Sequence, residues 1–134
     1  MKIIIAGAYA IGTYLAKLLS RNNQNIVLMD ESIEHLEKIG ADYDLMTMNA
    51  SCTSPRSLKE AGADKADLFI AVTPDESKNL AACTLAKALG MMVIIEGVEN
   101  EDQMNYLKGT GADYLQGYYL NKPLPVKKFE ELYL

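Results

Sequence analysis

The sequence predicts an α/β fold, a doubly wound and mainly parallel sheet of six strands with helices on both faces. Short runs of β-branched and apolar residues alternate with segments of helical periodicity along all 134 residues, as in repeated βαβ units. The centres of these runs, such as Ile-Ile-Ile and Val-Ile-Ile, are almost wholly apolar, as strands covered on both faces require. A chain of this length normally builds one core, so residues 1–134 are expected to form a single domain.

The first half contains three strands and two helices in alternation. They span residues 2–6, 11–21, 25–29, 32–39 and 44–48. The first helix carries one apolar stripe at positions i, i+3, i+4, i+7 and i+8, formed by Ile11, Tyr14, Leu15, Leu18 and Leu19. Gly40 follows the second helix, where a left-handed C-terminal cap is expected.

The second half continues this alternation with four helices and three strands. They span residues 55–61, 67–72, 75–89, 92–96, 101–108, 114–117 and 126–133. Ser54 and Asn100 precede their helices as N-caps, and Pro55 suits a first helical position. The last helix places Phe129, Leu132 and Tyr133 on one face and is expected to cover the sheet. Four methionines in or beside strands, Met46, Met48, Met91 and Met92, are expected to fill the core.

Composition argues against several partners and chemistries. Thirteen Lys and Arg against eighteen Asp and Glu give a net charge of −5, so no attraction to nucleic acid or to an anionic membrane surface is expected. No apolar run approaches the roughly 20 residues of a membrane span, and we expect a cytoplasmic protein. The single histidine, His35, lies in a charged stretch and is predicted at an exposed helix position. Cys83 is expected to be buried and inert, and Cys52 to lie in a polar loop.

A glycine-rich turn follows the first strand. Residues 7–12 read Gly-Ala-Tyr-Ala-Ile-Gly and open a helix, and Asp30 ends the next strand about twenty residues later. This is the layout of the dinucleotide-binding fingerprint, G-x-G-x-x-G. It predicts a three-layer, Rossmann-like sheet with the strand order 3-2-1-4-5-6.

Residues 1–84 resemble the Trk-type NAD-binding domain of regulators of potassium conductance. The resemblance is carried by Lys-Ile-Ile-Ile-Ala-Gly, Tyr-Leu-Ala-Lys-Leu-Leu, Val-Leu-Met-Asp and Ala-Asp-Leu-Phe-Ile-Ala-Val-Thr-Pro-Asp-Glu. It implies a site for NAD or an adenine nucleotide that regulates potassium transport. In that site Gly7 and Gly12 would form the phosphate turn, Asp30 would bind the adenosine ribose, and Thr73 would lie near the cleft.

Tyr9 stands where the fingerprint has its middle glycine. That glycine lets the pyrophosphate approach bare backbone, so a phenol there is expected to occupy the phosphate's space or to cap the crevice. On this interpretation Gly7, Tyr9, Gly12, Asp30 and Thr73 are the vestige of a site, and no cofactor is bound. The alternative is a nucleotide-sensing module that still binds NAD(H) or an adenine nucleotide.

Residues 85–134 resemble the last βα units of EAL-type cyclic di-GMP phosphodiesterases, which are (β/α)₈ barrels. The resemblance is carried by Glu-Gly-Val-Glu, Gln-Gly-Tyr and Lys-Pro-Leu-Pro. It implies that Glu96, Glu99 and Gln116 are remnants of an active site. Several further carboxylates needed to hold catalytic metal ions are missing, so we expect no catalytic residues and no enzyme activity. A weak divalent-ion site formed by Glu96 and Glu99 with Asp75 remains as a minor alternative.

The two resemblances meet inside the helix at residues 75–89, near Thr84. Barrel and Rossmann sheets share right-handed βαβ crossovers, so a fragment of a barrel could complete an open sheet. We therefore predict an engineered chimeric scaffold without a function of its own. Two alternatives remain, the nucleotide-sensing module and a residual receptor for a cyclic dinucleotide. A homodimer through the last strand or the last helix is a further expectation.

Overall fold

The computed structural model describes residues 1–39 and 43–133, and within them it contains one six-stranded parallel sheet. The strand order is β3-β2-β1-β4-β5-β6, so the predicted class and order are confirmed. The strands are β1 (Lys2–Ala6), β2 (Asn25–Asp30), β3 (Met46–Asn49), β4 (Leu68–Ala71), β5 (Met92–Ile95) and β6 (Tyr114–Leu115). Gly40, a predicted helix cap, lies outside the described residues.

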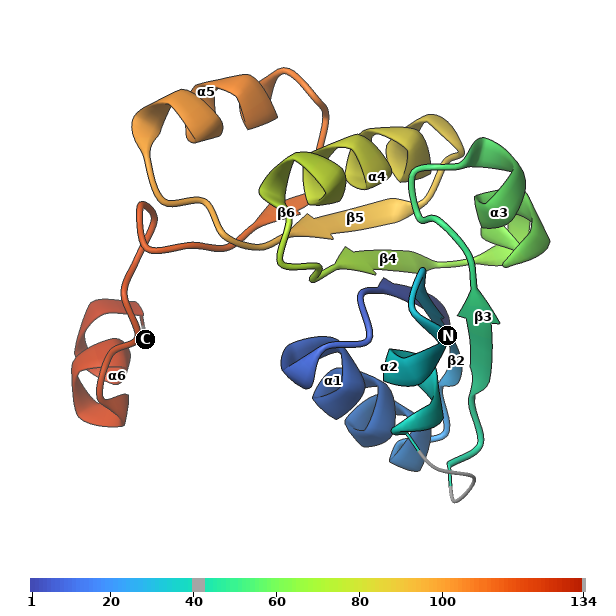
Figure 1. The fold of residues 1–134 in the computed structure, drawn as a ribbon. Helices are drawn as coiled ribbons and strands as arrows, with labels where there is room; N and C mark the ends of the chain where they lie inside the picture. The colour runs from blue at the N-terminus through green and yellow to red at the C-terminus, as the bar shows by residue number, and fades with distance from the viewer. Residues whose placement is uncertain (40–42, 134) are drawn as a thin grey trace.

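Helices cover both faces of the sheet (Figure 1). One face carries α1 (Ala10–Arg21) and α2 (Ile33–Glu37). The other carries α3 (Pro55–Glu60), α4 (Glu76–Ala88) and α5 (Glu101–Lys108). The predicted caps occur at α3 and α5, where Ser54 and Asn100 accept hydrogen bonds from the backbone N–H groups of Ser57 and Gln103. A 3₁₀ turn, η1 (Ala63–Lys65), was not predicted.

Alternating side chains of the central strands supply two separate cores. Ile3 and Ile5 pack with α1 and α2, whereas Ile4 and Ala6 pack with α3 and α4, and none of these four is more than 3% exposed. Full burial of one such isoleucine contributes about 1.5–3 kcal/mol. The continuous apolar runs therefore fix strands that are covered on both faces.

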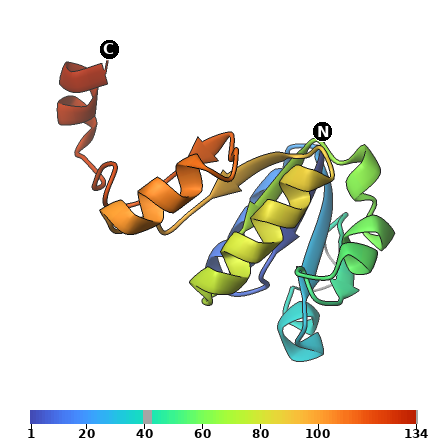
Figure 2. The same cartoon turned by 90° about the horizontal axis from the view of Figure 1, so that it is seen from above.

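The last helix, α6 (Val126–Tyr133), lies apart from the sheet (Figures 1 and 2). Val126, Phe129 and Leu132 are 72%, 49% and 60% exposed. The expectation that this helix covers the sheet was wrong. The segment before α6, residues 116–125, explains why the helix lies apart. It follows the two-residue strand β6 and contains Pro123 and Pro125. It therefore does not form a regular βα connection that would return the helix to the sheet.

Two other packing predictions need correction. Met46 and Met92 are exposed rather than in the core, because Met46 is on the edge strand β3 and Met92 begins β5. Cys52 lies in the loop before α3, as predicted, but its side chain is buried in the core on the α3 and α4 side of the sheet. Cys83 is buried, as predicted.

Candidate functional site

A cavity of about 290 Å³ lies at the carboxyl ends of β1, β2 and β4. Strand β1 is followed in space by β2 on one side and β4 on the other, so this is the point at which the strand order reverses. Open parallel sheets bind ligands at such a point. The described side chains and backbone that line it are those of Gly7, Tyr9, Met29, Asp30, Glu31, Ser32, Ala50, Cys52, Thr73, Pro74, Asp75 and Lys78.

Two glycines bring the start of α1 against the ends of β1 and β4. Gly7 has φ +109°, and a Cβ there would lie 2.9 Å from backbone atoms of Val72 and Thr73. A Cβ on Gly12 would collide with the carbonyl oxygen of Gly7. The first turn of α1 therefore begins directly at the cavity, where helix N–H groups without intrahelical partners and the helix dipole favour an anion.

Asp30, at the end of β2, has a carboxylate held by three neighbours. Its Oδ2 accepts a hydrogen bond from the backbone N–H of Ala8 at 2.7 Å, and its Oδ1 accepts one from the N–H of Ser32 at 2.8 Å. His35 Nδ1 lies 3.2 Å from the same Oδ1. Burial raises the pKa of Asp30, but the bonds from Ala8, Ser32 and His35 outweigh it and leave the pKa below its usual value. The carboxylate is therefore ionised and fixed in orientation.

Tyr9 occupies the rim of the cavity. It is the N-cap residue of α1, and its ring packs on the imidazole of His35 with centroids 4.4 Å apart and planes tilted by 58°. Tyr9 as a whole is 44% exposed. The side chain is thus drawn towards α2, and the cavity of about 290 Å³ remains beside it.

His35 is a site residue that the sequence prediction missed. Its side chain is only 25% exposed and contacts both Tyr9 and Asp30, so the predicted exposed surface position was wrong. The charged residues around His35 in the sequence, such as Glu34 and Glu37, suggested an exposed position. The spacing was the available signal. His35 follows Asp30 by five positions and so falls in the first turn of α2, which folds back over the end of β2.

The loop after β4 is held by a buried amide. Asn79 is 7% exposed, and its Oδ1 lies 2.9 Å from the backbone N of Thr73 and 2.6 Å from Thr73 Oγ1. Its Nδ2 donates to the carbonyl oxygen of Thr73 at 2.8 Å. Thr73 therefore lies at the cavity, as the resemblance implied, but its hydroxyl is engaged with the protein.

Lys78 is the only Lys, Arg or His side chain among the described residues that line this cavity. Its Nζ lies 2.6 Å from Oε2 of Glu31. Their hydrogen bond raises the pKa of Lys78 and lowers that of Glu31. The pair joins the loop after β2 to α4 and places one cation at the cavity, which no feature of the sequence had indicated.

The carboxylates of the second half lie elsewhere. Glu96, Glu99 and Gln116 line a separate cavity of about 730 Å³ beside the ends of β5 and β6, so these three predicted remnants do come together. Asp75 lines the first cavity instead, so the minor metal-site alternative that included it is wrong. Within residues 1–39 and 43–133, no group of three or more His, Cys, Asp or Glu side chains could hold a metal ion.

Sequence comparison decides the family. The family described as "TrkA-N domain" matches residues 3–116. The chain belongs to this family. Membership of this family agrees with the expectation that the chain is not an enzyme. The match continues on both sides of Thr84, so the prediction of an engineered chimera joined at that residue is not supported.

Curated relatives of the TrkA-N domain are potassium uptake proteins. The chain is 40% identical over 89 residues to "Trk system potassium uptake protein TrkA" of Vibrio alginolyticus, covering 66% of this chain and 19% of that protein. It is 30% identical over 105 residues to the homologue of Archaeoglobus fulgidus, covering 78% and 24%. The chain therefore spans about a fifth to a quarter of the length of these relatives.

A further match of 43% identity over 49 residues is to "Probable cyclic di-GMP phosphodiesterase PdeN" of Escherichia coli. It covers 37% of this chain and 10% of that protein. The likeness to EAL-type phosphodiesterases is therefore confined to a short segment and does not extend to the enzyme as a whole.

Solved structures agree with the fold. The TrkA-N domain of inner membrane protein ybaL from Escherichia coli has a TM-score of 0.77 at 15% identity, covering 99% of this chain and 96% of that one. The GsuK channel bound to NAD gives 0.70 at 20%, covering 86% and 21%. The Shewanella denitrificans Kef C-terminal domain in its AMP-bound form gives 0.68 at 18%, covering 89% and 73%. At these identities the likeness shows the fold alone.

Proposed function

We propose that residues 1–134 act as one nucleotide-sensing domain, which binds NAD(H) or an adenine nucleotide in the cavity beside Asp30. The observation that carries this proposal is the close approach of Gly12 to Gly7, which opens the start of α1 into a cavity bordered by an ionised carboxylate. These are the two groups that a nucleotide needs, an anion site and a ribose acceptor.

The adenosine ribose is proposed to bind at Asp30. A carboxylate offers roughly four lone-pair positions, and the bonds from Ala8 and Ser32 and the contact with His35 occupy three of them. One remains for a ribose hydroxyl. Because the cavity of about 290 Å³ lies at the small end of ligand pockets, we propose that it holds the adenosine half and that further groups extend along the start of α1.

The phosphates are proposed to bind over the first turn of α1. Tyr9 lies at the rim, with its ring packed on His35, so its side chain leaves the helix end approachable from the side of Thr73. Lys78 supplies a positive charge at the same cavity. A phosphate would compete with Glu31 for Lys78, whose pair with Glu31 is half exposed and therefore worth little by itself.

The wider role is proposed from the relatives. Several are potassium uptake proteins, and the channel cited above was solved with NAD. We propose that this domain couples nucleotide binding to potassium transport from the cytoplasmic side. None of the helices within residues 1–39 and 43–133 has the length and apolar character needed to span a membrane.

Self-association is proposed through the last elements of the chain. Strand β6 is the outer strand of the sheet beyond β5, and an edge strand offers unpaired backbone groups. Val126, Phe129 and Leu132 of α6 are half to mostly exposed. Light scattering across a concentration series tests this: a monomer at every concentration would contradict it.

Isothermal titration calorimetry with NADH, ATP and AMP tests nucleotide binding. The expected result is a dissociation constant below about 100 μM for at least one of them, a range typical of a specific small-ligand site, and loss of binding in Asp30→Ala. Asp44→Ala is the matched control, because Asp44 is exposed near the amino ends of β2 and β3, whereas Asp30 lies at the carboxyl end of β2. Absence of binding by all three nucleotides, or equal losses in both variants, would reject the proposal.

Cyclic di-GMP belongs in the same series. The large cavity bordered by Glu96, Glu99 and Gln116 makes a residual cyclic dinucleotide receptor the second candidate. It requires heat of binding that disappears in Glu96→Gln and Gln116→Ala and persists in Asp30→Ala.

A further inference from the structure

A second cavity, of about 310 Å³, lies between α4, α5 and the loop that follows β5. It shares no lining residue with the proposed nucleotide cavity. Three of its four buried lining residues, Ile95, Val98 and Leu107, are apolar. The fourth is Asn79, whose amide is already bonded to Thr73. Leu80 and Tyr106 extend this apolar wall towards the surface. The cavity can therefore cover an apolar group of modest size.

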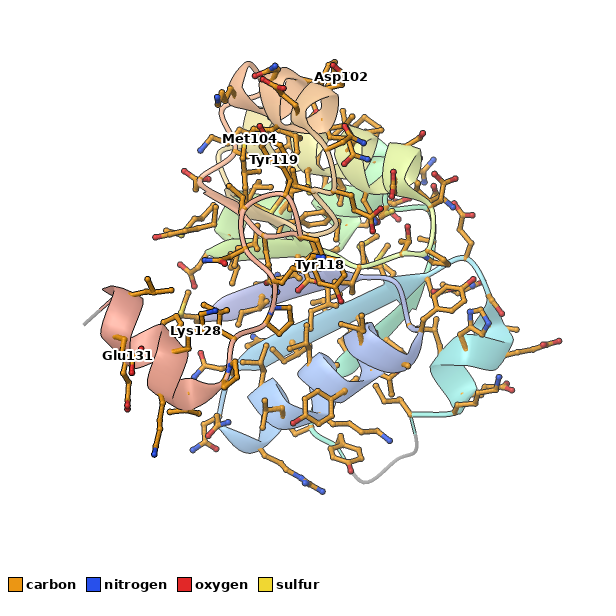
Figure 3. All side chains as sticks on the ribbon, turned by 90° about the vertical axis from the view of Figure 1, so that its left-hand side faces the viewer. Asp102, Met104, Tyr118, Tyr119, Lys128 and Glu131 are labelled. Atoms are coloured by element: carbon orange, nitrogen blue, oxygen red, sulfur yellow. The ribbon has the colours of Figure 1, made fainter. Side chains whose placement is uncertain are left out.

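All the charged side chains at this cavity are acidic. Glu76, Glu96 and Asp102 line it, and no Lys, Arg or His is among its described lining residues. Glu76 accepts a hydrogen bond from Gln103 Nε2 at 2.9 Å. Within the described part of the chain, Glu96 and Asp102 have no side-chain hydrogen bond and no ion pair. Lys128 lies well apart from Asp102, on α6 (Figure 3).

Glu96 is the least exposed of the three carboxylates at this cavity. It is partly buried where β5 ends, and burial raises its pKa. A carboxylate that loses water without gaining a donor is destabilised in its charged form. A cation placed beside it would relieve this cost, and the neighbouring charges of Glu76 and Asp102 would attract the same ion.

The combination of acidic and apolar side chains at this cavity indicates which kind of cation would bind there. The carboxylates do not converge, since no described group of three or more could hold a metal ion. The buried apolar side chains offer no oxygen ligands to a metal, and the amide oxygen of Asn79 already accepts hydrogen bonds from Thr73. An anionic ligand such as a phosphate would be repelled by three acids. An organic ammonium ion with an apolar body matches both the charge and the apolar lining.

We propose that this cavity is a binding site for small organic cations, in which a primary ammonium group contacts Glu96 and an apolar body packs against Leu80, Val98 and Leu107. The site is separate from the proposed nucleotide site, and binding there does not require a nucleotide.

The test uses phenethylamine hydrochloride as the probe, titrated into the full chain and followed by amide NMR shifts. We expect saturable shifts confined to residues 76–80, 95–98 and 102–107, with a dissociation constant on the order of 1 mM or below, as expected of a ligand this small. Phenylethanol, of the same shape without charge, should bind at least tenfold more weakly. Sodium chloride at equal ionic strength should cause no saturable shift.

Two charge variants separate the site from a general effect of net charge. Glu96→Gln should weaken phenethylamine binding at least tenfold, and Asp102→Asn is a second variant should the first fail to fold. Glu99→Gln is the matched control, because Glu99 is three residues away and does not line this cavity, although both acids border the larger cavity of about 730 Å³. Equal weakening in Glu96→Gln and Glu99→Gln, equal binding of phenylethanol, or stronger saturable shifts with magnesium chloride at the same residues would each overturn the proposal.

Discussion

His35 Nδ1 lies 3.2 Å from Asp30 Oδ1, and the same imidazole packs on the ring of Tyr9. This contact ties α2 to the end of β2 and to the start of α1. It orients the carboxylate on which the proposed nucleotide site depends. Tyr9, which stands in place of the middle glycine of the turn, is thus held at the rim of the cavity by His35 of α2.

Replacing His35 by Ala should lower the free energy of unfolding by about 0.5–1.5 kcal/mol, because the contact with Asp30 and the packing of Tyr9 are both lost. Urea denaturation followed by circular dichroism measures the change. Glu34→Ala serves as control, since Glu34 is an exposed neighbour on the same helix. An equal effect of the two substitutions would show that the contact is of no consequence.

The pKa of Asp30 predicts a specific dependence of stability on pH. The carboxylate is ionised more readily in the folded state than its ordinary value of 3.8 implies. Its stabilisation is therefore present above that value and is lost as the pH falls through the lower folded-state pKa. Asp30→Asn should be less stable than the parent protein at pH 7, and the difference should shrink below pH 4. A difference that stays constant between pH 7 and pH 2.5 would contradict this assignment.

Gly12→Ala should be among the most damaging small substitutions in the chain. The added methyl group would meet the Gly7 carbonyl, which is backbone and cannot move aside, so we expect a loss of about 2–4 kcal/mol. Gly109→Ala is the matched control, because Gly109 has φ −80° and its added methyl would lie 3.4 Å from the nearest atom. Thermal unfolding of the two variants side by side gives the comparison.

Both cysteines should be protected in the folded protein. Burial raises the pKa of Cys83 to about 12 and also raises that of Cys52, so little reactive thiolate exists at pH 8. A chromogenic disulfide reagent should label neither thiol rapidly in the native state and both in urea. Rapid labelling of one thiol in the native protein would place that side chain at the surface.

The sheet could be predicted from the sequence because its signal is local. Ile3–Ile5 and Val93–Ile95 are continuous apolar runs, and such short runs are typical of parallel strands that are buried on both faces. The turn from Gly7 to Gly12 was equally readable, because each glycine meets a steric demand of the fold. The position of α6 could not be predicted. Its amphipathic pattern indicates that one face is apolar, but not which part of the protein packs against that face.

The side chains at the site could be predicted only where the fingerprint names them. Asp30 follows from its distance to the turn. The place of Lys78 depends on how the start of α4 meets the loop after β2, a contact between residues 47 positions apart. His35 was obscured by charged neighbours that face water. The burial of Cys52 was not predicted, because its polar neighbours indicate a loop but do not show which way its own side chain points.

An amide NMR titration of the full chain with NADH, and with AMP as a second ligand, tests the nucleotide site residue by residue. We expect saturable shifts for at least one of these ligands at residues 7–12, at Asp30 to Ser32 and at Thr73, all absent in Asp30→Ala. Shifts confined to residues 95–117, or none with either ligand at millimolar concentration, would contradict a nucleotide site at the end of β1.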